Sequence, residues 1–387
     1  MVRMAAMVLG GLLVLSGCKT GKVEQPAAGL QKRFGDEIVV AGQFYRTGAP
    51  VVTWMDQGGF DGYRVDRRFV KFEESSWEAT TRAIAAGKSD LDPDSPARYN
   101  MRYSRAATRP TSPYTPEMLE QIRGGGWTLE QLQKHVDQFV LHYDVCGTSR
   151  QCFKVLHDMR GLSVHFMLDL DGTIYQTLDL KERTWHATRS NDRSIGIEIA
   201  NMGSYSLKES VAVLAEWYKK DENGKTYIEI PKRFGGASSQ RVPGVYRPAR
   251  NQMVVGQVQG VTQRMYDLTP QQYDSLVKLT AALCDVFPEI KCDYPRDEEG
   301  KLITKTLTNE QWASFKGVLG HYHVQPDKSD PGVALQWDYV IDGARKVLEG
   351  RGVEVRTAER MSLGEVKAPA TKAVVESGKL PGVVISP

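Results

Sequence analysis

Short apolar runs rich in β-branched residues mark the middle of the chain. FVLHY (139–143) and SIGIEIAN (194–201) have the length and composition of buried strands. SVHFMLDL (163–170) and TIYQTL (173–178) flank Asp171-Gly172, a pair that strongly favours a tight hairpin turn. This part of the sequence therefore predicts several strands, two of which are joined by a hairpin.

Helical patterns lie between and after these runs. Residues 151–160 have apolar positions at helical spacing, and a second helix is expected from Pro270 to about Val286. Thr269 suits the N-cap of that helix, because Pro270 would then stand in the first turn, where its missing amide hydrogen is not needed. A last helix is expected over 337–349. Since strands and helices interleave, we expect an α/β fold with a mixed central sheet flanked by helices.

The pattern also suggests how the chain is divided. The main domain is expected over 131–350, with a Gly-, Pro- and Tyr-containing insertion at 204–263. Inserted segments of this length usually serve a function, and we expect this one to cover or shape a substrate cleft. An N-terminal extension at 35–130 contains short β-like runs but indicates no chemistry. Residues 351–387 are expected to form a flexible tail.

The first 17 residues have the features of an export signal peptide. Arg3 supplies the positive start and an apolar core follows, as export signals require. The ending Leu15-Ser16-Gly17-Cys18 resembles a bacterial lipobox, in which Cys18 becomes the lipid-modified first residue. A plain secretory signal and a buried N-terminal helix are the alternatives.

A lipid on Cys18 would change where the protein works. Each buried acyl methylene contributes ~0.8 kcal/mol, so several chains anchor a protein without a spanning helix. Residues 18–34 are polar and contain Pro and Gly, as a tether between membrane and domain would. Lys19, rather than an aspartate, follows the cysteine, which is typical of sorting to the periplasmic face of the outer membrane.

Composition excludes some functions. A net charge of +3 over 387 residues and the absence of a basic stripe interleaved with aromatics argue against a nucleic-acid binder. No apolar tract after the amino terminus is long enough to span a membrane. The remaining cysteines form two close pairs, Cys146/Cys152 and Cys284/Cys292. In an exported protein such pairs favour two disulfides over metal thiolates.

The loop GHYHVQPDKSDPG (320–332) contains the most suggestive chemistry. His321 and Asp330 are suitable zinc ligands, and Lys328 would place a positive charge beside the metal. An ordinary charged surface loop is the alternative reading. His323 competes with His321 as the ligand, since the sequence reads His-Tyr-His.

Two strand residues could complete a catalytic site. His142 ends an apolar run and would be a third ligand, leaving one position for water, although a core histidine bonded to a carbonyl would have the same pattern. Glu198 lies inside an apolar β run, where a carboxylate is costly unless it has a role, so it is a candidate base. It could instead face outward on an edge strand. Lys328 would then face the developing oxyanion.

Four ordered segments carry a family resemblance: FVLHYDVCGTSRQC, SVHFMLDLDGTIYQTL, RTWHATRSNDRSIGIEIAN and GHYHVQPDKSDPG. Together they resemble the zinc-dependent N-acetylmuramoyl-L-alanine amidases, the superfamily that includes the peptidoglycan recognition proteins. The resemblance covers about 135–345 and fits the insertion poorly. It implies a recognition-protein-like α/β fold, a Zn²⁺ cofactor and peptidoglycan or muropeptides as the partner.

The resemblance also implies roles for individual residues. His142, His321 and Asp330 match the zinc ligands of the bacterial branch, and Glu198 and Lys328 match its catalytic residues. Trp185 and His186 match the family's Trp-His pair beside the substrate cleft, and Cys146 and Cys152 match the spacing of a disulfide in the recognition proteins. The chain departs from the recognition proteins at Val164, where they carry a catalytic tyrosine, and this difference shifts the base role onto Glu198.

The expected activity is hydrolysis of the amide between N-acetylmuramic acid and L-alanine. Three alternatives remain open: a peptidoglycan-binding envelope lipoprotein on the same fold without catalysis, a structural tether, and an enzyme with a cysteine nucleophile. Zinc content, release of free peptide and the thiol count distinguish them.

Overall fold

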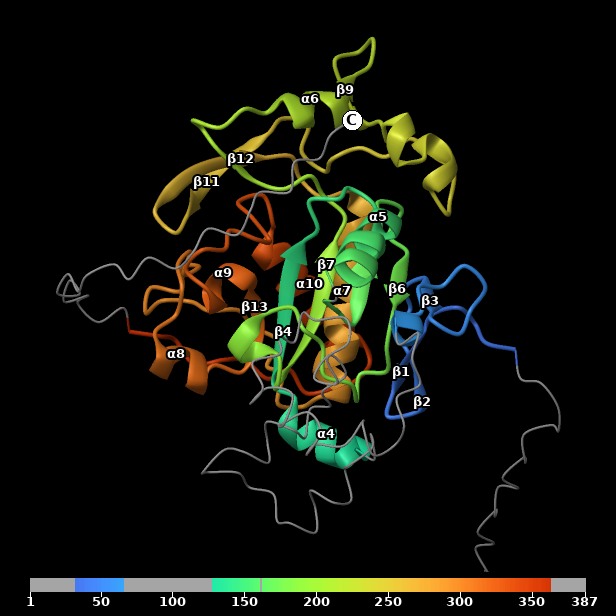
Figure 1. The fold of residues 1–387 in the computed structure, drawn as a ribbon. Helices are drawn as coiled ribbons and strands as arrows, with labels where there is room; N and C mark the ends of the chain where they lie inside the picture. Colours follow the sequence, from blue (N-terminus) through green and yellow to red (C-terminus); the bar gives the residue numbers. More distant parts are fainter. Residues whose placement is uncertain (1–31, 66–126, 161, 363–387) are drawn as a thin grey trace, which may run out of the picture. The chain divides into compact units, whose positions relative to one another are not determined.

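The computed structural model describes residues 32–65, 127–160 and 162–362 (Figure 1). The signal peptide with Cys18, most of the 18–34 tether, the 66–126 part of the extension and the end of the tail lie outside the described residues. From Gly35 onward the described chain belongs to one compact unit. Within it, no helix is both long and apolar enough to cross a bilayer.

A six-stranded mixed sheet lies at the centre of this unit. Its β5–β6 pair is antiparallel, as the Asp171-Gly172 turn predicts, and all other neighbouring pairs are parallel. The expected mixed α/β fold is thus confirmed. The strands in spatial order are β13 (Gly317–Gly320), β4 (Gln138–Tyr143), β7 (Ser194–Ile199), β5 (Phe166–Leu168), β6 (Ile174–Gln176) and β3 (Val51–Thr53).

Side chains alternate between the two faces of the sheet along each strand, and apolar side chains point to both faces. Helices therefore cover both faces. In β5, Phe166 and Leu168 pack in the main core with α7 (Pro270–Val286) and α10 (Trp337–Gly350). Met167 packs on the other face with α5 (Ser149–Phe153) and the π-helical turn that continues it over Lys154–Met159. The three helical segments predicted from the sequence are therefore confirmed.

Local signals explain where α7 begins. The Thr269 hydroxyl accepts a hydrogen bond from the Gln272 amide, and the Gln272 side chain accepts one from the Thr269 amide. Pro270 follows in the first turn. This reciprocal capping satisfies two amide groups that would otherwise lack partners.

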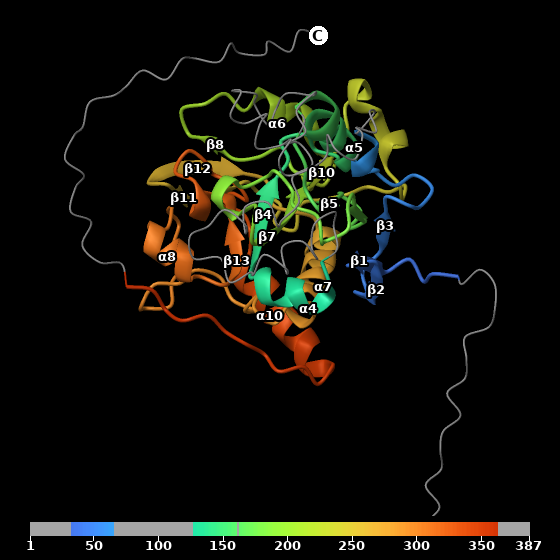
Figure 2. The ribbon, with the colours of Figure 1, turned by 60° about the horizontal axis from the view of Figure 1, so that its bottom comes forward.

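The insertion is a folded layer and not a loop. It contains β8 (Tyr205–Ser206), α6 (Ala212–Trp217), β9 (Tyr218–Lys220), β10 (Thr226–Ile228), β11 (Val254–Val258) and β12 (Val261–Met265). Trp217 and Leu214 anchor its own hydrophobic cluster, which also includes Met202 from the end of the β7 segment. In Figure 1 this layer lies beyond the carboxyl end of β4, while α4 (Leu129–His135) lies at the opposite end, as Figure 2 also shows.

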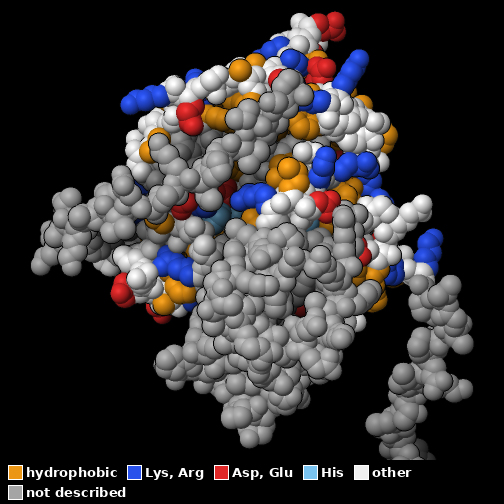
Figure 3. All heavy atoms as spheres, in the orientation of Figure 1, with side chains coloured by type: hydrophobic (Ala, Val, Ile, Leu, Met, Phe, Trp, Pro, Cys, Tyr) orange, Lys and Arg blue, Asp and Glu red, His pale blue; other side chains and the backbone are white. Residues whose placement is uncertain are grey.

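The insertion also carries exposed apolar side chains. Figure 3 shows hydrophobic patches on this part of the molecule. The large apolar residues of the insertion that stay about half exposed or more are Leu207, Val242, Val245, Val255 and Val261.

The N-terminal extension contributes to the sheet. After the antiparallel pair β1 (Glu37–Val40) and β2 (Gln43–Arg46), β3 pairs in parallel with β6 and completes the sheet edge. The Gln176 side chain accepts a hydrogen bond from the Val39 amide at 2.7 Å and donates one to the Val39 carbonyl at 2.8 Å. The short turn η1 (Gly62–Val65) ends the first described part of the extension.

The tail begins later than the sequence suggests. The Arg356 carbonyl accepts a hydrogen bond from Cys292, and the Met361 amide donates one to Arg296. Val353 and Val355 also pack against the main core. The prediction of a flexible tail is therefore wrong for 351–362, because apolar residues spaced two apart attach this segment to the domain.

Candidate metal centre

Two neighbouring parallel strands bring the candidate ligands together. His142 is the fifth residue of β4, and His321 directly follows β13 as the first residue of the one-turn helix α9 (His321–Val324). Because β4 and β13 are paired in parallel, their carboxyl ends meet at the same edge of the sheet. The loop after α9 then returns and places Asp330 beside both histidines.

The three side chains converge on one point. The Nδ1 atoms of His142 and His321 lie 3.0 Å apart, and Oδ2 of Asp330 lies 2.8 Å from the first and 3.0 Å from the second. All three residues are at most 8% exposed. The sequence prediction that these residues form one cluster is thus matched by the geometry.

His323 is not part of this cluster. Its Nδ1 accepts a hydrogen bond from the Gly320 amide at 2.8 Å, and its Nε2 bonds with the Ile303 carbonyl at 2.6 Å. Both ring nitrogens are therefore engaged with the backbone, and the ring is fully buried. His321 is the residue that faces His142 and Asp330, which removes the ambiguity in His-Tyr-His.

Each candidate ligand histidine is held from behind by a second side chain. Nε2 of His142 hydrogen-bonds with Nδ1 of His186 at 2.9 Å, and Nε2 of His186 with the Ser194 hydroxyl at 3.1 Å. Nε2 of His321 hydrogen-bonds with the Gln325 amide oxygen at 2.7 Å. A proton on each Nε2 leaves Nδ1 as a lone-pair donor that faces the centre.

Sequence reasoning missed these outer partners. Gln325 follows His321 by four residues, a spacing at which two side chains meet on a helical turn, and that spacing could have identified it. His186 is the expected cleft residue, but its ring also contacts a candidate ligand.

Electrostatics favour a neutral His142 and an ionised Asp330. Burial, followed by the nearby His321 ring, lowers the pKa of His142 to about 4. Burial alone would raise the pKa of Asp330, but the interactions with His321 and His142 outweigh it and hold that pKa below its usual range. Neutral imidazoles and an ionised carboxylate are the forms that bind a metal.

The donor set fits a divalent metal such as zinc. Ligand atoms around a tetrahedral ion with bonds of about 2.0–2.1 Å lie ~3.3 Å apart, only slightly more than the 2.8–3.0 Å separations here. Two imidazoles and one carboxylate form a ligand set that catalytic zinc sites use, with one position left for water or substrate. His142, His321 and Asp330 can therefore hold a metal.

Glu198 lies beside this group on β7. It is the register partner of His142 across the β4–β7 pair, so the two side chains share one face of the sheet. β7 is an interior strand and Glu198 is buried, which excludes the outward-facing alternative. Burial, with the charges of Asp330 and Asp144 second, raises the pKa of Glu198. Among the described residues, its Oε2 has no hydrogen-bond partner.

Asp144 stabilises the turn that follows β4. Its Oδ1 accepts hydrogen bonds from the amides of Cys146, Gly147 and Asn201 at 2.9 to 3.1 Å. Burial raises the pKa of Asp144 to about 7 despite these bonds. Its carboxylate belongs to the support of the site and not to the converging group.

Lys328 is close to the centre but not in it. Its ammonium lies 3.6 Å from Asp327, and its side chain is 37% exposed. Its charge nevertheless contributes to the lowered pKa of His142. Lys328 can therefore turn toward a ligand that enters from the solvent side.

Trp185 and His186 come from the segment before β7. The Arg183 guanidinium lies 4.1 Å from the centre of the Trp185 ring. The His186 ring lies directly over Gly196, where a Cβ atom would come within 2.5 Å of Nδ1. The glycine in SIGIE is therefore needed to admit His186. The role of both residues in substrate binding remains a prediction.

Within each of the two cysteine pairs, the two thiols lie close together. The structure holds all four as free thiols. A hydrogen bond with Cys146, and then burial, raise the pKa of Cys152, and the same causes act on Cys284 beside Cys292. The expected partners thus face one another, and their oxidation to disulfides remains a prediction.

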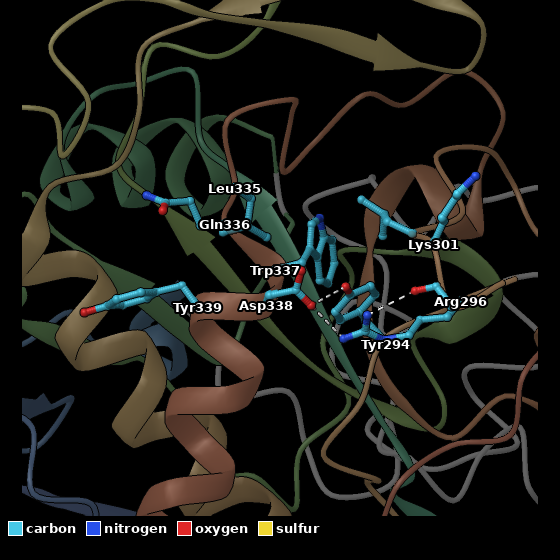
Figure 4. Close-up of a pocket in the computed structure, with 10 residues that line it drawn as sticks. Tyr294, Arg296, Lys301, Leu335, Gln336, Trp337, Asp338 and Tyr339 are labelled. Atoms are coloured by element: carbon cyan, nitrogen blue, oxygen red, sulfur yellow. Dashed lines mark hydrogen bonds and ion pairs between the residues drawn. The ribbon is translucent and has the colours of Figure 1, made fainter.

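A cavity of about 590 Å³ lies elsewhere, at the start of α10 (Figure 4). Its Arg296 is bound to Asp338 at 2.8 Å and to Asp293 at 3.1 Å, and lies 3.8 Å from the centre of the Tyr294 ring. No candidate ligand lines this cavity. We therefore place the functional site at the carboxyl ends of β4 and β13.

The mixed sheet and its buried His-His-Asp group define an α/β domain able to hold a metal at a strand edge. The profile of one family, N-acetylmuramoyl-L-alanine amidase, matches residues 132–333, just over half of the chain. The chain belongs to this family of peptidoglycan amidases.

Solved structures with low similarity include three amidases. AmiD from E. coli, in complex with anhydro-N-acetylmuramic acid-L-Ala-D-gamma-Glu-L-Lys, has 17% identity and a TM-score of 0.29, covering 54% of this chain and 57% of its own. The endolysin LysCS from Clostridium intestinale URNW has 16% identity and a TM-score of 0.28, covering 58% and 88%. A selenomethionine derivative of AmpD has 17% identity and a TM-score of 0.27, covering 55% and 86%. No curated protein sequence matches the chain.

Proposed function

We propose that this protein is a zinc-dependent hydrolase that cleaves the amide between N-acetylmuramic acid and L-alanine in peptidoglycan or its muropeptide fragments. The convergence of His142, His321 and Asp330 on one buried point supports this proposal most directly. Membership of the amidase family supplies the bond and the substrate class.

The three ligand residues would hold the ion, and zinc would polarise the scissile carbonyl and lower the pKa of water so that it can attack at neutral pH. Asp330 would offset part of the ion's charge. His186 and Gln325 would keep Nδ1 of His142 and His321 aimed at it.

Glu198 is the proposed general base. Its raised pKa makes the carboxylate a better proton acceptor than an exposed glutamate, and its unpaired Oε2 is free to take the proton from the attacking water. The same oxygen can then pass the proton to the departing amine of L-alanine. Lys328, which reaches the site from its solvent side, would stabilise the negative charge that develops on the carbonyl oxygen.

The experiment uses purified full-length protein and purified muropeptides. Mass spectrometry should find free stem peptide together with an intact sugar lactyl group, and metal analysis should find about one zinc per chain. His142→Ala should lose both zinc and activity, whereas Asn223→Ala, in a surface turn of the insertion, should keep both. Peptide release by the metal-free protein or by His142→Ala would refute the mechanism. Binding of muropeptides without release would instead indicate a non-catalytic receptor.

We also propose that the protein is exported and anchored by a lipid on Cys18, at the periplasmic face of the outer membrane. The support is the lipobox-like sequence before Cys18 and the lysine after it. Metabolic labelling with a fatty acid should mark the wild type, and Cys18→Ala should release the protein from the membrane fraction. Labelling of Cys18→Ala would contradict the anchor.

A further inference from the structure

The tip of the β11–β12 hairpin reaches the loop that carries the candidate ligands. Gln259 and Gly260 are the two central residues of its turn, since Val258 and Val261 are the last paired residues. Both have positive φ, 53° and 74°. Two positive φ values describe a type I′ turn, in which asparagine or glycine is favoured at the first position. A glutamine there is unusual, so its side chain is the feature to explain.

The Gln259 side chain is fully committed to hydrogen bonds. Its Oε1 accepts from the Thr306 amide at 3.1 Å, and its Nε2 lies 2.8 Å from the Thr306 hydroxyl. The same Nε2 lies within 3.4 Å of three backbone carbonyl oxygens of one loop: those of Tyr322 at 2.9 Å, Gln325 at 3.0 Å and Lys328 at 3.4 Å. The Thr306 hydroxyl also donates to the Tyr322 carbonyl at 2.9 Å.

The three carbonyls belong to residues that are close to the candidate ligands in the sequence or in space. Tyr322 directly follows His321, Gln325 bonds to the ring of His321, and Lys328 stands two residues before Asp330. The side-chain amide of Gln259 therefore contacts the backbone at three points along the His321–Asp330 segment. Within this described segment, the single turn of α9 and one hydrogen bond from the Tyr322 amide to the Asp330 carbonyl at 3.1 Å also hold His321 and Asp330, and the Gln259 contacts add to them.

We propose that Gln259 is a positioning residue for the metal centre, so that the insertion helps to set the distance between His321 and Asp330. The inference rests on the zinc site proposed above. Gln259 itself touches neither a ligand nor the substrate position; it acts through the loop backbone. A change in outer support of this kind commonly costs 10- to 100-fold in metal affinity.

The turn provides variants that separate this role from folding. Gln259→Gly and Gln259→Asn both suit a positive φ, so the hairpin should form at least as well as in the wild type. Neither can reach the loop as glutamine does, because glycine has no side chain and asparagine is one methylene shorter. Gln257→Ala, an exposed position on the same hairpin, is the matched control.

The full-length protein would be tested for zinc affinity by chelator competition, for the visible spectrum of its cobalt form, and for the melting temperature of its metal-free form. We expect both Gln259 variants to bind zinc 10- to 100-fold more weakly and to show an altered cobalt spectrum, with an unchanged metal-free melting temperature. Zinc affinity within twofold of Gln257→Ala would overturn the proposal. A metal-free melting temperature that falls in both variants would also overturn it, since Gln259 would then only hold the fold. If the wild type itself bound no zinc, the proposed metal centre would fail, and this inference with it.

Discussion

Gly196 offers a sharp test of how the His142 ring is held. A Cβ atom at this position would lie 2.5 Å from Nδ1 of His186, 2.6 Å from its Cε1 and 2.8 Å from its Cγ. These atoms belong to the ring that bonds with Nε2 of His142. The substitution Gly196→Ala therefore acts on a candidate zinc ligand through one intermediate ring.

The magnitude follows from the distances. Carbon and nitrogen atoms in ordinary contact stand about 3.5 Å apart, so the His186 ring must move by roughly 1 Å. Such overpacking in a dense interior costs about 1–3 kcal/mol. The displaced ring would also lose its 2.9 Å bond with His142, at about 1 kcal/mol more. We expect a melting temperature about 4–8 °C lower and zinc affinity 10- to 100-fold weaker.

Calorimetry of the metal-free protein and chelator competition for zinc measure the two effects separately. Gly350→Ala is the control, because a Cβ there meets nothing within 4 Å. The double variant Gly196→Ala/His186→Ala should regain stability but keep the weak zinc binding, since the clash disappears while the support does not return. If Gly196→Ala folds normally and its zinc affinity is unchanged, the view that His186 orients His142 is refuted.

Four further predictions concern the site and the Cys284/Cys292 pair. His321→Ala should abolish zinc binding. His323→Ala should keep zinc binding but lose about 2–3 kcal/mol of stability, because two buried hydrogen bonds are lost with the ring. The opposite outcome in zinc analysis would reverse the ligand assignment. Glu198→Gln should reduce amide hydrolysis at least about 10²-fold. In the metal-free wild type, Glu198 is more fully protonated in the folded than in the unfolded state above pH ~4.3, so its own contribution to the free energy of unfolding falls as pH rises. Denaturant titrations of wild type and Glu198→Gln should therefore differ by this falling contribution, and parallel curves would contradict the raised pKa. Protein isolated from the cell envelope should resist alkylation at Cys284 and Cys292 until it is reduced, and free thiols in the denatured, unreduced protein would exclude that disulfide.

Much of the fold could be predicted because its signals are local. The Asp171-Gly172 turn, the Thr269-Pro270 start of α7 and the apolar runs of β4 and β7 each depend on neighbouring residues. The candidate ligands were also predictable, since their residue types and their places at strand ends carry the information.

The remainder depends on contacts between distant residues. Sequence spacing does not show which of His321 and His323 is the ligand. The hydrogen bond between the Ile303 carbonyl and the His323 ring shows that His323 has another role. The pairing of β3 with β6 joins segments more than a hundred residues apart, which a short apolar run does not encode. The support from Gln259 depends on contacts between the hairpin and the ligand loop, which are distant in the sequence.

The edge strand β3 shows that the family boundary and the folding boundary differ. The amidase profile begins at residue 132, but Ile38, Val51 and Val52 of the extension are buried in the protein's cores. A protein shortened to begin at residue 132 would expose the edge of β6. The buried side-chain amide of Gln176 would also lose its hydrogen-bond partner Val39. An unpaired edge invites association with other chains. We therefore expect the smallest stably folded form of this protein to begin near residue 35, about a hundred residues before the start of the family match.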